Sequence, residues 1–194
     1  MKYSSLVAGA LFAAVAMPAT AVESIYTAVL TGSAEAPPHE SPATGTATVT
    51  IDTGSYTMRV QETFSGLLAE NTASHIHCCT TEPRTGTAGV ATTTPTFTGF
   101  PSGSSGVYDH TFDMTNASSY NSAFLTANGG APLSAFDALV AGLNSGSAYA
   151  NIHSERFTAG EIRGFLTLVP EPETYAMLLA GLGLVSLVAR RRKV

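Results

Sequence analysis

The fold is indicated by a stretch of alternating residues, Tyr56-Thr57-Met58-Arg59-Val60-Gln61-Glu62-Thr63-Phe64. On a β-strand, its apolar side chains lie on one face, and Arg59 and Gln61 lie on the other. We expect the apolar face to belong to the core, although Glu62 interrupts it. Similar segments rich in Thr, Val, Tyr and Phe alternate along the chain with clusters of Gly, Pro, Ser and Asn. This pattern is typical of an all-β sandwich or barrel.

The pattern predicts strands at 24–31, 45–52, 56–66, 73–77, 94–100, 107–114, 148–154 and 160–169. Two stretches have helical spacing instead, 132–143 and the shorter 122–127. We therefore expect an antiparallel, Greek-key-like β-sandwich in which one or two short helices cross between strands.

Composition narrows the class of protein. The chain has 194 residues, of which 12% are charged, against about 25% in an ordinary globular domain. This excludes a coiled coil, a basic nucleic-acid binder and an acidic disordered tail. The length suits one domain. The mean hydropathy of +0.18 is too low for a protein with several membrane spans, and the apolar residues are concentrated at the two ends.

The N-terminus has the parts of a secretory signal peptide. Lys2 supplies positive charge, residues 6–17 are largely apolar, and Ala19-Thr20-Ala21 has the small-x-small pattern of a cleavage site. We expect cleavage after Ala21. The alternative, a buried N-terminal helix, is disfavoured because nothing amphipathic runs through residues 4–21.

The C-terminus combines Pro170-Glu171-Pro172, an apolar run over 175–189 and a basic cluster over 190–193. As a helix the apolar run rises about 22 Å, which is short of a hydrocarbon core of about 30 Å. The basic cluster should stay cytoplasmic. This tail resembles the PEP-CTERM sorting signal of Gram-negative bacteria. The resemblance implies a short transmembrane helix held transiently in the inner membrane, processing by an exosortase-type enzyme, and delivery to the cell surface or extracellular matrix.

The segment between these ends is acidic. Residues 22–172 hold 13 acidic and four basic residues, a net charge of −9. Such a domain repels phosphate backbones and anionic lipid, so nucleic acid is not expected as a partner.

The densest group of reactive side chains is Ser74-His75-Ile76-His77-Cys78-Cys79. On a strand, His75 and His77 project from the same face, and Ile76 points to the core. A third imidazole, His153, ends the similar segment Tyr149-Ala150-Asn151-Ile152-His153.

Three histidines plus a solvent or thiolate position are the ligand set of a zinc or copper site. We predict that His75, His77 and His153 converge on such a site, with Cys78 or Cys79 as a fourth ligand. The alternative is that the imidazoles are buried, neutral and hydrogen-bonded.

The two cysteines, Cys78 and Cys79, are adjacent and have no third cysteine to pair with. In an oxidising compartment, a vicinal disulfide, metal thiolates and an intermolecular bridge all remain open. Glu161 and Arg163, two residues apart on the last predicted strand, are interpreted as a structural ion pair that bridges to adjacent strands or loops. No Gly-x-Ser-x-Gly, phosphate-binding Gly loop or His-Glu-x-x-His motif occurs, so no catalytic residues are predicted.

Three segments together resemble the CHRD domain, first described in chordin, over about residues 25–168. They are Ala28–Pro38, Ser74–His77, and Tyr149–Ser154 followed by Gly160-Glu161-Ile162-Arg163-Gly164. The resemblance implies a secreted β-sandwich and carries over His75, His77, His153, Glu161 and Arg163. The chain departs from the family pattern where Cys78-Cys79 replaces Gly-Pro and Ala159-Gly160 replaces Pro-Gly. A local similarity to copper/zinc superoxide dismutase rests on the His-x-His strand alone and assigns no activity.

The sequence therefore predicts a signal peptide (1–21), a CHRD sandwich (22–168) and a sorting signal (169–194). We expect an exported surface or matrix protein that acts by binding or assembly rather than by catalysis. Its expected partners are an exosortase-type enzyme and extracellular polysaccharide or surface proteins. The alternative is a copper- or zinc-dependent redox enzyme that uses the His-x-His site.

Overall fold

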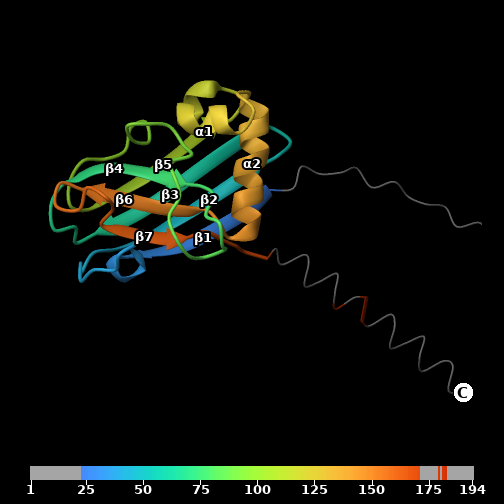
Figure 1. Cartoon of the computed structure of the whole chain (residues 1–194). Coiled ribbons are helices and arrows are strands. Elements are labelled where there is room, and N and C mark those ends of the chain that lie inside the picture. The colour runs from blue at the N-terminus through green and yellow to red at the C-terminus, as the bar shows by residue number, and fades with distance from the viewer. Residues whose placement is uncertain (1–22, 171–178, 180, 183–194) are drawn as a thin grey trace, which may run out of the picture.

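The structure is a computed structural model that describes residues 23–170 together with 179, 181 and 182. Within these residues the chain is mainly β, and its strands form one antiparallel sheet in the order β4-β6-β7-β1-β2-β3-β5, with β8 paired to β1 (Figure 1). The strands are β1 (Glu23–Thr31), β2 (Thr44–Asp52), β3 (Thr57–Ser65), β4 (Asn71–His77), β5 (Gly106–Asp113), β6 (Tyr149–Ser154), β7 (Ile162–Phe165) and β8 (Thr167–Leu168). The helices are α1 (Ser122–Ala127) and α2 (Pro132–Ser145), with 3-10 turns at Gly32–Ala34 and Ala117–Ser119.

The predicted two-sheet sandwich is corrected to a single sheet that curls on itself. The sheet is continuous because β1 pairs with β7 at Thr31 and Arg163, which joins the two halves that a sandwich would keep apart. Curling still brings the inner faces of β3 and β4 together. Ser74 on β4 donates a hydrogen bond of 2.6 Å to the buried carboxyl group of Glu62 on β3.

Seven of the eight predicted strands are found, with shifted ends, and the strand predicted at 94–100 is wrong. That segment follows an irregular path in which Phe97 is fully buried and its N–H donates to the carbonyl of Ser74. Two aromatic side chains that contact the core from a loop, Phe97 and the half-buried Phe100, therefore produced the strand-like composition. The strand predicted at 160–169 is divided into β7 and β8 at Leu166.

The core lies inside the curled sheet. Met58, Val60 and Phe64 on β3 are buried, as the alternation predicts, whereas Tyr56 precedes the strand and is 38% exposed. Helix α2 stands at one end of the sheet (Figure 1) and buries its Phe136 and Leu139.

Both ends of α2 carry ordinary helix signals. Pro132 occupies the first turn, where its missing N–H costs nothing. Gly146 ends the helix in the left-handed conformation, with φ of 72°.

The predicted signal peptide and most of the predicted C-terminal helix lie outside the described residues. Of the sorting motif Pro170-Glu171-Pro172, only Pro170 is described. Among the residues that the structure describes, no helix is both long and apolar enough to span a membrane.

Candidate metal centre

Two neighbouring strands place three imidazoles on one face. Strands β4 and β6 pair antiparallel, with His75 opposite Asn151 and Ala73 opposite His153. Because side chains alternate between faces, His75, His77 and His153 all project from the side of the sheet away from Ile76 and the core. Their ring centroids lie 5.4 Å (His75–His153), 5.8 Å (His77–His153) and 5.9 Å (His75–His77) apart.

Each ring is held by a hydrogen bond from one nitrogen to a backbone carbonyl. His75 Nε2 donates to Pro95 at 2.7 Å, and His77 Nδ1 donates to Ala88 at 2.9 Å. His153 Nδ1 donates to Thr158 at 3.0 Å. A carbonyl oxygen only accepts, so the second nitrogen of each neutral ring carries a lone pair.

These second nitrogens are His75 Nδ1, His77 Nε2 and His153 Nε2, and all three are buried without a hydrogen-bond partner. One ligand atom from each ring lies within 4.8 Å of the others. Three atoms at that spacing share a point about 2.8 Å or less from each, against about 2.0–2.1 Å for a zinc–nitrogen bond. Small movements of the rings would close this difference, so the three residues fit a metal ion.

Burial keeps the imidazoles neutral. Desolvation lowers the pKa of His75 and of His77 to about 4, and it also lowers the pKa of His153. The neutral ring is the form that binds a metal ion. Burial with hydrogen bonds explains one nitrogen of each ring, but it leaves the other three nitrogens unsatisfied.

Cys78 and Cys79 do not join this group, which corrects their prediction as a fourth ligand. The two cysteines are bonded to each other in a disulfide. Cys78 follows His77 and points to the opposite side, where it is buried in the hydrophobic core. The sulfur atoms pack against Gly142 of α2, where a Cβ atom would clash with both of them.

A set of polar and aromatic side chains surrounds His77. Tyr149 stacks on its ring with a centroid distance of 4.8 Å, and the tyrosine hydroxyl donates to the same Ala88 carbonyl at 3.2 Å. The guanidinium of Arg163 lies 4.9 Å from the Tyr149 ring centroid. This packing fixes the orientation of the His77 ring.

Glu161 and Arg163 each contact neighbouring loops, as a structural role requires, but the acidic partner of Arg163 is Glu35, at 3.8 Å. Glu35 also accepts a hydrogen bond of 2.7 Å from Asn151. Glu161 is buried elsewhere and accepts from the Ser41 hydroxyl and the Leu68 N–H at 2.7 and 2.8 Å. Both acidic side chains are structural.

Sequence reasoning missed Glu35, Tyr149 and Asn151 as members of the site. All three lie within the segments that carry the family resemblance, and that was the available signal. Glu35 is far from Arg163 along the chain, so spacing within one strand could not identify the pair.

Two family models match the chain. A model described as the CHRD domain matches residues 26–166, and a model described as the PEP-CTERM protein-sorting motif matches residues 168–193. Comparisons with curated proteins and with solved structures find no match.

Proposed function

Because the chain belongs to the CHRD domain family and ends in a PEP-CTERM sorting motif, we propose that it is an exported surface protein that binds a transition-metal ion. The sorting motif implies export, C-terminal membrane anchoring and processing by an exosortase. Delivery to the surface or matrix of a Gram-negative bacterium is the expected result. Zinc or copper would be held by His75, His77 and His153.

One observation carries the proposal. Three buried ring nitrogens have no partner in rings whose ligand atoms lie within 4.8 Å of one another, while the opposite nitrogen of each ring donates to a backbone carbonyl. A buried polar atom left unsatisfied costs about 1–3 kcal/mol. A single cation would satisfy all three atoms at once. Metal-ligating histidines commonly donate their other N–H to a carbonyl in this way.

The ligand atoms differ between the rings. His75 would bind through Nδ1, and His77 and His153 would bind through Nε2. Three protein ligands leave one position of a tetrahedral ion for water or for a donor atom of a partner. The bound ion would thus supply a Lewis-acidic position on an acidic surface protein, which suits a role in binding or assembly.

Calorimetric titration with zinc and with copper tests this proposal on protein purified without chelators. We expect one ion per chain. Substitution His153→Gln should weaken binding by more than the 10–100-fold typical of an outer-shell change. His110→Gln is the control, because His110 lies on β5, outside the cluster. Equal affinity for the wild type and His153→Gln would refute the site.

The open fourth position also favours a second candidate, a copper- or zinc-dependent redox enzyme. This candidate requires turnover of a small redox substrate by the metal-loaded protein, with loss of turnover in His75→Gln. If the protein binds one metal ion per chain but turns over no redox substrate, the enzyme is rejected and the metal-binding surface protein is supported.

A further inference from the structure

The outer face of β1, β2 and β3 carries an array of hydroxyl groups. We name this array the threonine face. It consists of Thr27, Thr44, Thr46, Thr48, Thr63 and Ser65. All six side chains alternate with buried neighbours and are exposed or half-buried, so they face outward.

Strand register aligns these side chains in rows across the sheet. Thr46 lies opposite Thr63, and Val29 and Val107 continue this row at its two ends. The rows Thr44–Ser65 and Thr27–Thr48 lie on either side of it. Neighbouring strands are about 4.8 Å apart, and residues on the same face repeat about every 6.5–7 Å along a strand. The hydroxyl groups therefore form a grid.

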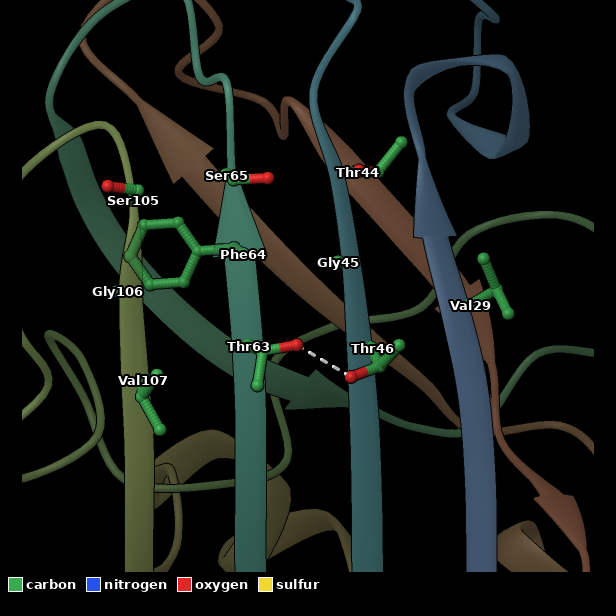
Figure 2. A pocket seen from close by; sticks show the side chains of 10 residues that line it. All are labelled: Val29, Thr44, Gly45, Thr46, Thr63, Phe64, Ser65, Ser105, Gly106 and Val107. Atoms are coloured by element: carbon green, nitrogen blue, oxygen red, sulfur yellow. Dashed lines mark hydrogen bonds between the residues drawn. The ribbon is translucent and has the colours of Figure 1, made fainter.

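The central hydroxyls have unused hydrogen-bonding capacity. Figure 2 shows Thr46 and Thr63 joined by a hydrogen bond of 2.7 Å. Each hydroxyl has one proton and two lone pairs, so the pair keeps a free donor and free acceptors. Around them lies an open hollow of about 570 Å³, and a second hollow of about 500 Å³ adjoins it at Thr27 and Thr48. Val29 and Val107, 69% and 74% exposed, add apolar surface.

Charge indicates which kind of partner fits. The threonine face itself is uncharged, although the described residues hold 12 acidic and four basic side chains. Arg59 and Asp109, on the neighbouring β3 and β5, neutralise each other in an ion pair. A polyanion is repelled by the acidic domain, and a polycation finds no charge to pair with on the grid. A neutral partner rich in hydroxyl groups is not repelled by the acidic domain and needs no charged group on the grid.

We infer that the threonine face binds an extended, neutral, β-linked polysaccharide. The hydroxyl groups of the polysaccharide would exchange hydrogen bonds with Thr46, Thr63 and their neighbours. The apolar faces of its sugar rings would contact the threonine methyl groups and Val29. The strand spacing is comparable with the length of one sugar unit in an extended chain. This inference is independent of the metal site, which lies on β4 and β6.

Binding of the full-length protein to microcrystalline cellulose tests the inference, with carboxymethyl cellulose as the anionic polymer of the same backbone. The double substitution Thr46→Val and Thr63→Val removes two hydroxyls and keeps shape and strand propensity. Because two hydroxyl groups that would bond the polysaccharide are lost, we expect roughly tenfold weaker binding to cellulose. Thr111→Val is the matched control, since Thr111 is an exposed threonine on β5 of the same sheet, outside the threonine face.

We expect the wild type to bind cellulose and to bind the carboxymethyl polymer more weakly. The Thr111→Val variant should bind cellulose as the wild type does, and the double variant should keep the unfolding midpoint of the wild type. Equal cellulose binding by the double variant would overturn the inference, and so would preference for the anionic polymer. Concentration-dependent dimerisation that the double variant abolishes would also overturn it, because the occupant would then be a second copy of the chain.

Discussion

At the scale of single residues, the chain keeps an acidic side chain inside its core. Glu62 is 1% exposed, and its only hydrogen bond within the described residues comes from the Ser74 hydroxyl. Burial raises the pKa of the Glu62 carboxyl to about 8. At neutral pH the folded protein therefore holds this side chain mainly in its protonated form.

Substitution Glu62→Gln should make stability less dependent on pH. The folded pKa of about 8 lies above the ordinary value of 4.5, so the wild type loses stability as pH rises between these values, and the loss is complete above pH 8. Glutamine has no proton to lose and can still accept from Ser74. We would measure the free energy of unfolding in urea at pH 5, 7 and 9. The difference between the variant and the wild type should grow in favour of the variant as pH rises. A constant difference across these pH values would contradict the buried, protonated carboxyl.

The residues of the proposed metal centre were predictable from the sequence to different degrees. Side chains alternate on a strand, so the spacing of His75 and His77 is enough to predict that they project from the same face. His153 joined them through its similar segment, which does pair with β4. The sequence could not show whether Cys78 and Cys79 join the histidines. That depends on which side of the sheet Cys78 faces and on packing against Gly142, which belongs to a helix distant in sequence.

At the scale of elements, the histidines tie a long loop to the sheet. Between β4 and β5 the chain runs from residue 78 to 105 without a helix or a named strand. The carbonyls of Ala88 and Pro95 in this loop accept from His77 and His75. A metal ion on the opposite nitrogens would fix the tautomers that make these bonds. Metal binding should therefore hold the loop more firmly.

Limited trypsin digestion can measure this coupling at the Arg84–Thr85 bond, because residues 81–87 are exposed. We expect slower cleavage at Arg84 when zinc is present. In His153→Gln the loop and its two histidine hydrogen bonds remain, but the weakened site should no longer confer protection. Equal cleavage rates with and without zinc, in protein that calorimetry shows to be loaded, would contradict the coupling while leaving the metal site intact.

The prediction of elements failed where a tertiary contact imitates a local pattern. The run from Thr94 to Phe100 is rich in Thr and Phe like a strand, yet Phe97 enters the core and Phe100 packs against it from an irregular loop. The single sheet was also not predictable, because it depends on pairing between β1 and β7, whose residues are far apart in the chain. Alternation identifies strands but not the partner of each strand.

At the scale of the whole molecule, the folded domain and the sorting motif adjoin without a spacer. The CHRD match ends at residue 166 and the motif match begins at 168. Strand β8 spans this junction, and the Val169 N–H donates to the Ile25 carbonyl at 2.7 Å. The sorting motif Pro170-Glu171-Pro172 therefore begins two residues after the end of β8.

Replacing Pro170, Glu171 and Pro172 by alanine should retain the full-length protein in the membrane fraction. The motif would no longer be recognised, and the tail beyond it is too short and too basic to cross the membrane by itself. Fractionation and immunoblotting measure the distribution, with substitution of the exposed Thr126 as a control. Unchanged delivery to the surface would contradict the role of these three residues.

X-ray absorption spectroscopy of protein isolated from its own cell envelope without chelators tests the claim that His75, His77 and His153 hold a metal ion. We predict about one zinc or copper ion per chain, bound by three imidazole nitrogens at about 2.0–2.1 Å and one further light atom. A protein that carries no stoichiometric metal would contradict the claim. Sulfur scattering at about 2.3 Å would contradict the histidine ligand set and restore Cys78 or Cys79 as a ligand.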